Sequence, residues 1–402
     1  MDHAAGHATH EPSADRRRWA ILLAGMLTMV AACAFQYGLP FLVPAFRASG
    51  LTLAQAGILI SAPVAGVLSS LVVWGAVTDR VGERRVLVAG LAATVVLLAA
   101  ASVVDGPLAL GLLLAAAGAT SSCVHVASGR LILGWFATHE RGLAMGLRQT
   151  AQPLGVALAA VALPGLGAAD PRPAIAFLAV ATAVALGSVL VLVRDPTGPG
   201  GGPAEATASP YRGAFLWRIH ASSSLLVVPQ FTVSAFAFDY LVNDRHWATS
   251  AAGTVLAAAQ VGGGGIRLFA GWWSDRARSR LRPMRLLALL TAVVLGGLTL
   301  GAAVGTPVTV VLLVVAAVLT ASTNGLAFTA VAERAGRYWA GRALGVQNTT
   351  QNVAAAATPP AMAALITAAG PATGYAAAFG VAVGFPIVAA LTIPVAGERP
   401  LG

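Results

Sequence analysis

The stretch Gly75–Arg85 reads GAVTDRVGERR, and a related stretch, Gly271–Arg280, reads GWWSDRARSR. Both contain the spacing G-x-x-x-D-R, and the second copy begins 196 residues after the first. Each copy lies in a short polar gap between two long apolar runs. A duplication of this kind predicts that the chain consists of two similar halves.

A second pair of segments repeats at nearly the same offset. The two segments are Arg141–Pro153, RGLAMGLRQTAQP, and Gly341–Asn352, GRALGVQNTTQN. At an offset of 199 the identical pairs are Gly142 with Gly341, Gly146 with Gly345, and Gln152 with Gln351. Because two unrelated motifs repeat at nearly one offset, we expect two halves related by an internal repeat.

The composition indicates that most of the protein surface faces lipid. Of the 402 residues, 57% are hydrophobic and 10% are charged, and the mean hydropathy is +0.79. A soluble domain has about 25% charged residues, which is more than twice the fraction found here. The apolar runs are each close to the roughly 20 residues that a helix needs to cross the hydrocarbon core of a bilayer.

These runs predict an all-α integral membrane protein with twelve transmembrane helices in two pseudo-symmetric six-helix bundles. The first bundle covers 19–193 and the second covers 214–395. The connecting segment 194–213 has the Gly/Pro/Ser/Thr composition of a flexible cytoplasmic linker, and cytoplasmic tails cover 1–18 and 396–402. The predicted spans are 19–44, 54–77, 86–104, 108–136, 143–166, 174–193, 214–241, 250–273, 285–304, 307–330, 342–368 and 374–395.

The distribution of positive charge predicts the orientation. All 25 basic residues are arginine; eighteen of them fall in segments on the side of the N-terminus, against three on the other side, Arg47, Arg172 and Arg245. The positive-inside rule therefore predicts a plasma-membrane protein with both termini in the cytoplasm. Because the arginines lie in short gaps between apolar runs, the net charge of +10 does not indicate nucleic-acid binding.

The chain contains no lysine, and this excludes two kinds of chemistry. A Walker A phosphate loop needs a lysine on the nucleotide phosphates, and Schiff-base catalysis needs a lysine amine. An intramembrane hydrolase would need paired acids or a histidine cluster, whereas the spans hold Asp239 and the well-separated His125 and His220. We therefore expect no enzyme activity, no cofactor and no metal.

The chain resembles the major facilitator superfamily, whose loop signature is matched at every position by Gly75, Asp79, Arg80, Gly82, Arg84 and Arg85. The second copy matches this signature in part, at Gly271, Asp275 and Arg276. Arg278 stands where a glycine is expected. The resemblance implies a secondary active transporter, monomeric in the lipid bilayer, that moves a small solute by alternating access.

The resemblance also implies a role for the duplicated loop. Asp79 is expected to accept hydrogen bonds from the N-terminus of the span 342–368, where an anion is favoured by ~0.3–2 kcal/mol. This contact would hold the cytoplasmic side closed. The alternative is that Asp79 and the neighbouring arginines only set the topology.

Ionisable residues inside the predicted spans indicate the charge of the solute. Arg130, Arg148 and Arg267 lie within spans, where each costs ~2.5–3.5 kcal/mol on insertion scales, so such residues usually face a polar pathway. Asp239 is the acid that falls clearly inside a span. The interior therefore lacks about two negative charges, which a small organic anion such as a carboxylate would supply.

Arg267 is the most informative of these arginines. It shares a helical face with Gln260, Gly264 and Gly271. The segment Arg267-Leu-Phe-Ala-Gly271 also resembles the helix 8 arginine element of proton-linked carboxylate transporters, with Gly263 at the place of their aspartate. A structural role in tying neighbouring helices together is the alternative.

Further polar residues complete the predicted substrate site. Arg148 lies on one helical face with Gln152, and His125 matches Asn324 at the offset of 199. Paired amides on symmetry-related helices can hydrogen-bond a polar ligand, and bonding between helices is the alternative. The predicted substrate-binding residues are Arg267, Arg148, His125, Gln152, Gln36, Tyr37, Gln230, Gln260, Asn324 and Gln351.

Two residues are candidates for proton coupling. His125 is of the type that titrates near neutral pH, and Asp239 lies towards the outer end of its span. The alternatives are a histidine satisfied by a neighbouring serine and an ion pair between Asp239 and Arg245.

The chief alternative function is a proton-driven multidrug or metabolite exporter. Exporters of that type often show a G-P-x-x-G-G element in helix 5 and an acidic residue in helix 1. Here the fifth span, 143–166, reads Gln152-Pro153-Leu154-Gly155 at this place, and the first span, 19–44, contains no acid. The sequence therefore favours the organic-anion interpretation.

Overall fold

The structure is a computed structural model that describes residues 12–168, 170–194, 209–370 and 373–398. Most of these residues are helical, and none of them forms a strand. The α-helices are α1 (Pro12–Gly38), α2 (Val43–Ala48), α3 (Leu53–Val81), α4 (Glu83–Ala101), α5 (Pro107–Ser121), α6 (Cys123–Trp135), α7 (Arg141–Leu166), α8 (Pro171–Leu192), α9 (Ala214–Asp239), α10 (Thr249–Arg276), α11 (Leu281–Val304), α12 (Val308–Leu319), α13 (Asn324–Ala335), α14 (Ala340–Ala369) and α15 (Gly374–Thr392). Shorter helical turns are η1 (Leu39–Leu42), η2 (Pro210–Arg212), η3 (Tyr240–Asp244) and η4 (Val395–Gly397).

The prediction of twelve helical spans is confirmed. The first span is α1 with η1 and α2, the fourth is α5 with α6, the tenth is α12 with α13, and each other span is one long helix. Among the described helices, ten spans are long and apolar enough to cross a membrane. The other two, α7 and α10, carry Arg148 and Arg267. Most of the proposed linker 194–213, and parts of both proposed tails, lie outside the described residues.

Two spans are interrupted at equivalent places. Ser122 separates α5 from α6, and residues 320–323 separate α12 from α13. The hydroxyl of Ser122 bonds back to the carbonyl of Ala119 (3.0 Å), and that of Ser322 bonds back to Leu319 (2.6 Å). Such bonds compete with the helical ladder. The breaks free main-chain carbonyls for other donors, which is tolerated within a membrane where the backbone is buried in protein.

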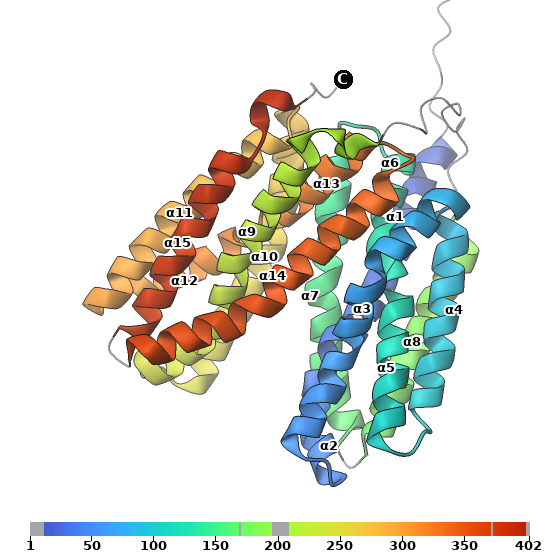
Figure 1. Cartoon of the computed structure of the whole chain (residues 1–402), viewed down its shortest axis with the longest axis horizontal. Coiled ribbons are helices and arrows are strands. Elements are labelled where there is room, and N and C mark those ends of the chain that lie inside the picture. Colours follow the sequence, from blue (N-terminus) through green and yellow to red (C-terminus); the bar gives the residue numbers. More distant parts are fainter. Residues whose placement is uncertain (1–11, 169, 195–208, 371–372, 399–402) are drawn as a thin grey trace, which may run out of the picture.

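The helices form two bundles, α1–α8 and α9–α15 (Figure 1). The bundles approach each other at the end that carries α6 and α13, here named the closed end. Their ribbons diverge towards the opposite end, which carries α2 and is named the α2 end.

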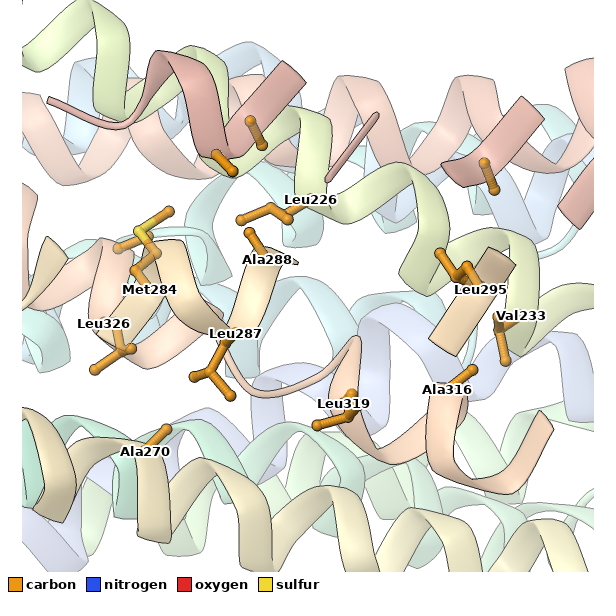
Figure 2. Close-up of a cluster of buried hydrophobic side chains, with 14 of the residues drawn as sticks. Leu226, Val233, Ala270, Met284, Leu287, Ala288, Leu295, Ala316, Leu319 and Leu326 are labelled. Carbon is orange, nitrogen blue, oxygen red and sulfur yellow. The ribbon is translucent and has the colours of Figure 1, made fainter. Parts of the chain in front are cut away.

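Each bundle has its own apolar core, and a further cluster joins the two. Figure 2 shows part of the core of the second bundle, with Leu226, Val233, Met284, Leu287, Leu295, Ala316, Leu319 and Leu326. The joining cluster includes Leu71 of α3, Met145 of α7, Phe328 of α13 and Leu344 of α14. Opening the closed end would expose these side chains to water, and each fully buried leucine or phenylalanine contributes about 1.5–3 kcal/mol against that.

Two glycine crossings let the bundles touch at the closed end. Gly75 of α3 lies against Gly341 of α14, and a Cβ atom on Gly75 would lie 2.4 Å from the carbonyl oxygen of Gly341. Gly271 of α10 lies against Gly142 of α7, and a Cβ atom on Gly271 would lie 2.3 Å from the carbonyl oxygen of Gly142. A larger residue would push the backbones apart. These crossings are named the α3–α14 seam and the α7–α10 seam.

Candidate functional site

The α3–α14 seam is bridged by Asp79. Its carboxylate accepts hydrogen bonds from the backbone N–H of Gly341 (2.7 Å) and of Arg342 (3.0 Å), in the first turn of α14. The N–H groups of a first turn have no acceptor within the helix, and negative charge interacts favourably with the helix dipole there. The hydrogen bonds expected of Asp79 are therefore present.

The α7–α10 seam repeats this arrangement with the two bundles in exchanged roles. Asp275 accepts hydrogen bonds from the backbone N–H of Gly142 (3.0 Å) and of Leu143 (2.9 Å), in the first turn of α7. Arg278 has a φ of 47°, at the position where the first loop has Gly82 with a φ of 94°. The second loop thus keeps the contact and a positive φ, although a non-glycine residue in that conformation costs roughly 1–2 kcal/mol.

Arginines support both carboxylates. In the first seam, Nε of Arg130 lies 3.7 Å from Oδ1 of Asp79. In the second, Arg280 forms an ion pair with Asp275, and its Nη2 lies 3.1 Å from Oε1 of Glu333. Burial alone would lower the pKa of Arg280, but Glu333 and Asp275 together raise its pKa above the ordinary value. Because Arg130 lies beside Asp79, it belongs to the closed end and not to the predicted substrate pathway.

The remaining residues of the duplicated motif lie at the surface of the closed end. Arg80 and Arg85 are exposed. Arg84 donates to the carbonyl oxygen of Leu190 (3.2 Å), and the guanidinium of Arg276 lies 4.4 Å from the ring centre of Trp272.

A polar cavity lies between the two bundles, bordered by α1, α6 and α7 on one side and α9, α13 and α14 on the other. Its volume is about 60 Å³, which holds roughly four ordered waters at about 15 Å³ each. No Asp or Glu is found among the described residues that line it. Six of the predicted substrate-binding residues line it: Tyr37, His125, Gln152, Gln230, Asn324 and Gln351.

The polar groups of the lining are partly paired with one another. The hydroxyl of Tyr37 donates to Oδ1 of Asn352 (3.3 Å), a contact that crosses between the bundles. Nδ2 of Asn324 donates to Oε1 of Gln230 (3.1 Å). By contrast, Nε2 of Gln351 is buried and has no hydrogen-bond partner among the described residues. A buried donor without a partner costs about 1–3 kcal/mol, so this group is poised to bind a ligand acceptor or water.

Arg148 is buried next to the cavity and is bound by neutral groups. The residue is 1% exposed. Its Nε donates to Oγ of Ser128 (2.9 Å), its Nη2 to the carbonyl oxygen of His125 (2.6 Å), and its Nη1 to Oε1 of Gln149 (3.0 Å). None of the ion pairs among the described residues includes Arg148.

Arg267 is also bound by neutral groups, and it links the two bundles. Its Nε donates to the carbonyl oxygen of Ala321 (3.2 Å) in the break between α12 and α13. Its Nη1 donates to the carbonyl oxygen of Gln149 (3.0 Å) in α7. Throughout the described part of the chain, the ion pairs leave Arg267 out as well. Neither guanidinium borders the cavity directly, but Gln149, which contacts both, does.

His125 borders the cavity and is fixed by Gln36. Its Nε2 lies 2.9 Å from Oε1 of Gln36, and Nε2 of Gln36 donates to Oγ of Ser121 (3.2 Å). An amide oxygen only accepts hydrogen bonds, so Nε2 of His125 carries the proton in this pairing. Gln36 therefore lies behind His125 rather than on the cavity surface.

Two predicted residues lie elsewhere. Gln260 is exposed on α10, on the face of Arg267 and about two turns nearer the α2 end, and it does not border the cavity. Asp239 ends α9 and accepts hydrogen bonds from Nδ2 of Asn243 (2.5 Å) and from the hydroxyl of Tyr375. Arg245 donates to the carbonyl oxygen of Thr306 (3.2 Å).

The cavity also contains residues outside the predicted substrate-binding set. Gln149, Asn348 and Asn352 add amides to it, and Met29, Phe231 and Phe328 add apolar surface. Gln149 and Asn348 are related by the offset of 199, and the repeat therefore indicates them as paired amides. Asn352 corresponds to Pro153 at that offset, and the repeat therefore gave no signal for it.

Comparison with known proteins identifies relatives along nearly the whole chain. The family model of the Major Facilitator Superfamily matches residues 22–359. An uncharacterized MFS-type transporter of Mycobacterium tuberculosis (strain H37Rv) is 39% identical over 391 residues, which cover 96% of this chain and 87% of that protein. A second uncharacterized MFS-type transporter, from the CDC 1551 strain of the same species, matches with the same identity and coverage.

Solved structures show the same fold at low sequence identity. The proton:xylose symporter XylE matches with a TM-score of 0.73 at 15% identity, over 96% of this chain and 98% of that one. The human organic anion transporter MFSD10 matches with a TM-score of 0.70 at 16% identity, over 95% of this chain and 100% of that one. A bacterial homologue of the iron transporter ferroportin, in an outward-facing state, matches with a TM-score of 0.71 at 15% identity, over 94% and 98%.

Proposed function

This chain belongs to the Major Facilitator Superfamily, and from that premise we propose that it is a secondary active transporter for a small organic anion such as a carboxylate. It works as a monomer in the plasma membrane, with the closed end and both termini facing the cytoplasm. The bundles 19–193 and 214–395 rock about the central cavity, and the segment 194–213 connects them. The two seams close the cytoplasmic side while the cavity loads.

The observation that carries the anion proposal is the state of Arg148 and Arg267. Both guanidinium groups are buried, and all of their hydrogen-bonded oxygen acceptors are neutral. On insertion scales an arginine in the middle of a membrane costs ~2.5–3.5 kcal/mol. A bound anion would offset this cost, because hydrogen bonds between charged partners are roughly twice as strong as neutral ones.

The chemistry of the cavity supports the same charge preference. The amides of Gln152, Gln230 and Gln351 can donate N–H groups to an oxyanion, and the Gln351 donor has no partner within the described part of the chain. The lining, as far as the structure describes it, offers no carboxylate to a cationic solute. An exporter of lipophilic cations would lack a counter-charge in this cavity.

Proton coupling is assigned to His125. Its Nε2–H bond to Gln36 leaves Nδ1 as the free acceptor of the ring. In the empty site the guanidinium of Arg148, which bonds the carbonyl oxygen of His125, opposes a second positive charge. A substrate anion reverses that field, so binding of the anion favours uptake of one proton. Asp239 is the second candidate, although Asn243 and Tyr375 already hold its carboxylate.

Thermal stabilisation of the purified protein tests the substrate class. The ligands are acetate, pyruvate, succinate and benzoate, the methyl esters of these acids, and tetraphenylphosphonium as a lipophilic cation. A ligand at 100 times its Kd stabilises the protein by about 2.7 kcal/mol. We expect at least one carboxylate to stabilise the wild type, and we expect its ester to have no effect.

The variants Arg148→Gln and Arg267→Gln locate the effect, with Arg218→Gln as the matched control. Arg218 is an exposed arginine that donates to the carbonyl oxygen of Thr392 (2.8 Å), so its loss removes one charge away from the cavity. Arg148→Gln and Arg267→Gln should both lose the stabilisation, and Arg218→Gln should keep it. If only the lipophilic cation stabilises the wild type, and it stabilises Arg148→Gln and Arg267→Gln equally, the exporter interpretation replaces this one.

A further inference from the structure

Gln149 contacts both buried guanidinium groups with different atoms. Its side-chain Oε1 accepts a hydrogen bond from Nη1 of Arg148 (3.0 Å), and its main-chain oxygen accepts one from Nη1 of Arg267 (3.0 Å). The residue is 6% exposed and borders the central cavity, which Arg148 does not. The amide of Gln149 is therefore the point at which the cavity reaches the charge of Arg148.

The contact between Gln149 and Arg148 is the hydrogen bond to an oxygen acceptor that can be exchanged without moving a helix; the same Nη1 also contacts Sδ of Met145 (3.7 Å), a weak acceptor. The acceptor at Nη2 of Arg148 is a main-chain oxygen, and the acceptor at Nε is the hydroxyl of Ser128, which itself donates to the main chain of α6 (2.5 Å). The side chain of Gln149 is long and flexible, and a change of rotamer withdraws its Oε1. Its main-chain oxygen stays in place when this happens, so Arg267 remains bound.

An amide oxygen and a carboxylate oxygen present the same kind of acceptor to a guanidinium, but only the carboxylate carries charge. Charge-assisted hydrogen bonds are shorter and about twice as strong as neutral ones. A carboxylate that enters the cavity therefore competes favourably with Oε1 of Gln149 for Nη1 of Arg148.

We propose that Gln149 is a specificity-determining residue whose amide oxygen occupies, in the empty transporter, the place of a substrate carboxylate oxygen on Arg148. This inference rests on the proposed anion transport and adds the residue that makes binding depend on the charge of the solute. Substrate binding displaces Oε1 of Gln149, and substrate release lets it return. The buried guanidinium thus keeps a partner in the empty carrier, whereas a neutral or cationic solute cannot displace the amide.

Three variants test this exchange, with the carboxylate that stabilises the wild type best as the probe. Gln149→Glu places a permanent carboxylate on Arg148, Gln149→Ala removes the placeholder, and Asn348→Asp is the matched control. Asn348 is the repeat equivalent of Gln149 and borders the same cavity, but its Nδ2 donates to the carbonyl oxygen of Leu344 (2.8 Å). Kd is measured by isothermal titration, and the melting temperature of the empty protein is measured alongside.

The two Gln149 variants should differ in their affinity for the carboxylate. Gln149→Glu raises the melting temperature of the empty protein and weakens carboxylate binding by about tenfold or more, because the tethered carboxylate competes at a high effective concentration. Gln149→Ala binds the carboxylate within about threefold of the wild type, or more tightly, because nothing has to be displaced. Asn348→Asp lowers the melting temperature of the empty protein and weakens binding less than Gln149→Glu.

Two results would overturn the inference while leaving anion transport intact. If Gln149→Ala loses carboxylate binding as completely as Gln149→Glu, then Gln149 is a direct ligand and not a placeholder. If Asn348→Asp weakens binding as strongly as Gln149→Glu, the effect is general charge repulsion. Failure of the proposed function itself would look different, since the wild type would then bind none of the carboxylates.

Discussion

The carboxylate of Asp79 accepts a 2.7 Å hydrogen bond from the backbone N–H of Gly341, so the last turn of α3 in one bundle caps the first turn of α14 in the other. Asp275 repeats this relationship with Gly142 at 3.0 Å. The closed end is therefore held twice by the same chemistry, at a place where a glycine of each bundle lets the backbones meet. The predictions below test these seams first and the cavity afterwards.

Replacing Asp79 by asparagine should weaken the α3–α14 seam. The amide keeps one oxygen acceptor and turns its NH2 group towards the second backbone N–H. A hydrogen bond to a charged group contributes about 1.5–3 kcal/mol, so backbone amides at 341 and 342 should exchange roughly 10- to 100-fold faster. Hydrogen exchange read by mass spectrometry measures this. Asp275→Asn is the control and should speed exchange at 142 and 143 instead; unchanged exchange at 341 and 342 in Asp79→Asn would contradict the account.

Adding one methyl group at a glycine crossing should destabilise the closed end. In Gly75→Ala the new Cβ atom would lie 2.4 Å from the carbonyl oxygen of Gly341, and overpacking of this kind costs about 1–3 kcal/mol. Gly187→Ala in α8 is the matched control, because a Cβ atom there meets nothing within 4 Å. In thermal unfolding Gly75→Ala should melt earlier than the wild type, and Gly187→Ala should match it or gain up to about 1 kcal/mol. Equal melting temperatures for the two variants would argue against a tight crossing.

The positive φ of Arg278 predicts a stabilising substitution. Arg278→Gly should gain roughly 1–2 kcal/mol, because glycine adopts a φ of 47° without the Cβ clash. Arg278→Ala removes the same charge but keeps the Cβ atom, so it should not show this gain. Gly82→Ala, at a φ of 94°, should lose about 1–3 kcal/mol. Thermal unfolding of the three variants checks the set, and an equal gain in Arg278→Gly and Arg278→Ala would assign the effect to charge.

Much of this architecture could be predicted from the sequence, because the duplicated motif and the apolar runs act locally. Asp79 and Asp275 follow from a loop signature, and the twelve spans follow from hydropathy. Other features depend on tertiary contacts. The breaks at Ser122 and at 320–323 arise from hydroxyl bonding inside runs that are apolar enough to read as continuous helices.

Within the candidate site, the contacts of Arg148 and Arg267 also depend on tertiary structure that the sequence does not define. The position of Arg148 and Arg267 inside spans indicates a function, and among the described residues neither has a carboxylate partner, which agrees with the predicted shortage of negative charge. That Arg148 and Arg267 bind carbonyl and amide oxygens beside the cavity, and that Gln149 joins them, depends on side-chain direction. Helical spacing alone does not define that direction, which is why Gln260 was expected in the cavity and lies outside it.

The unpaired amide of Gln351 predicts opposite effects on stability and binding. Gln351→Leu removes a buried donor for which the described residues offer no partner, so the free protein should lose no stability or gain about 1 kcal/mol. Carboxylate binding should weaken about tenfold, as a lost hydrogen bond to a charged ligand implies. Titration calorimetry and thermal unfolding measure the two effects.

Gln347→Leu is the control for this substitution. Gln347 lies one turn away on the same helix, but its amide is bound to Nδ1 of His220 (2.6 Å) and to the hydroxyl of Ser223. Leucine there removes the partner of Nδ1 of His220 and the donor to Ser223, whose hydroxyl keeps its bond to the carbonyl oxygen of His220, and the change should cost about 1–3 kcal/mol. If Gln351→Leu is destabilised as much as Gln347→Leu, the Nε2 group of Gln351 is not the free donor described above.

Transport by the purified protein in liposomes tests the central claim most directly. A radiolabelled form of the best-binding carboxylate is supplied outside, with an inward proton gradient, and uptake is compared between the wild type, Arg148→Gln and the control Arg218→Gln. The account predicts accumulation above the outside concentration by the wild type and by Arg218→Gln, and none by Arg148→Gln. Uptake by Arg148→Gln at the wild-type rate, or movement of tetraphenylphosphonium instead of the carboxylate, would contradict it.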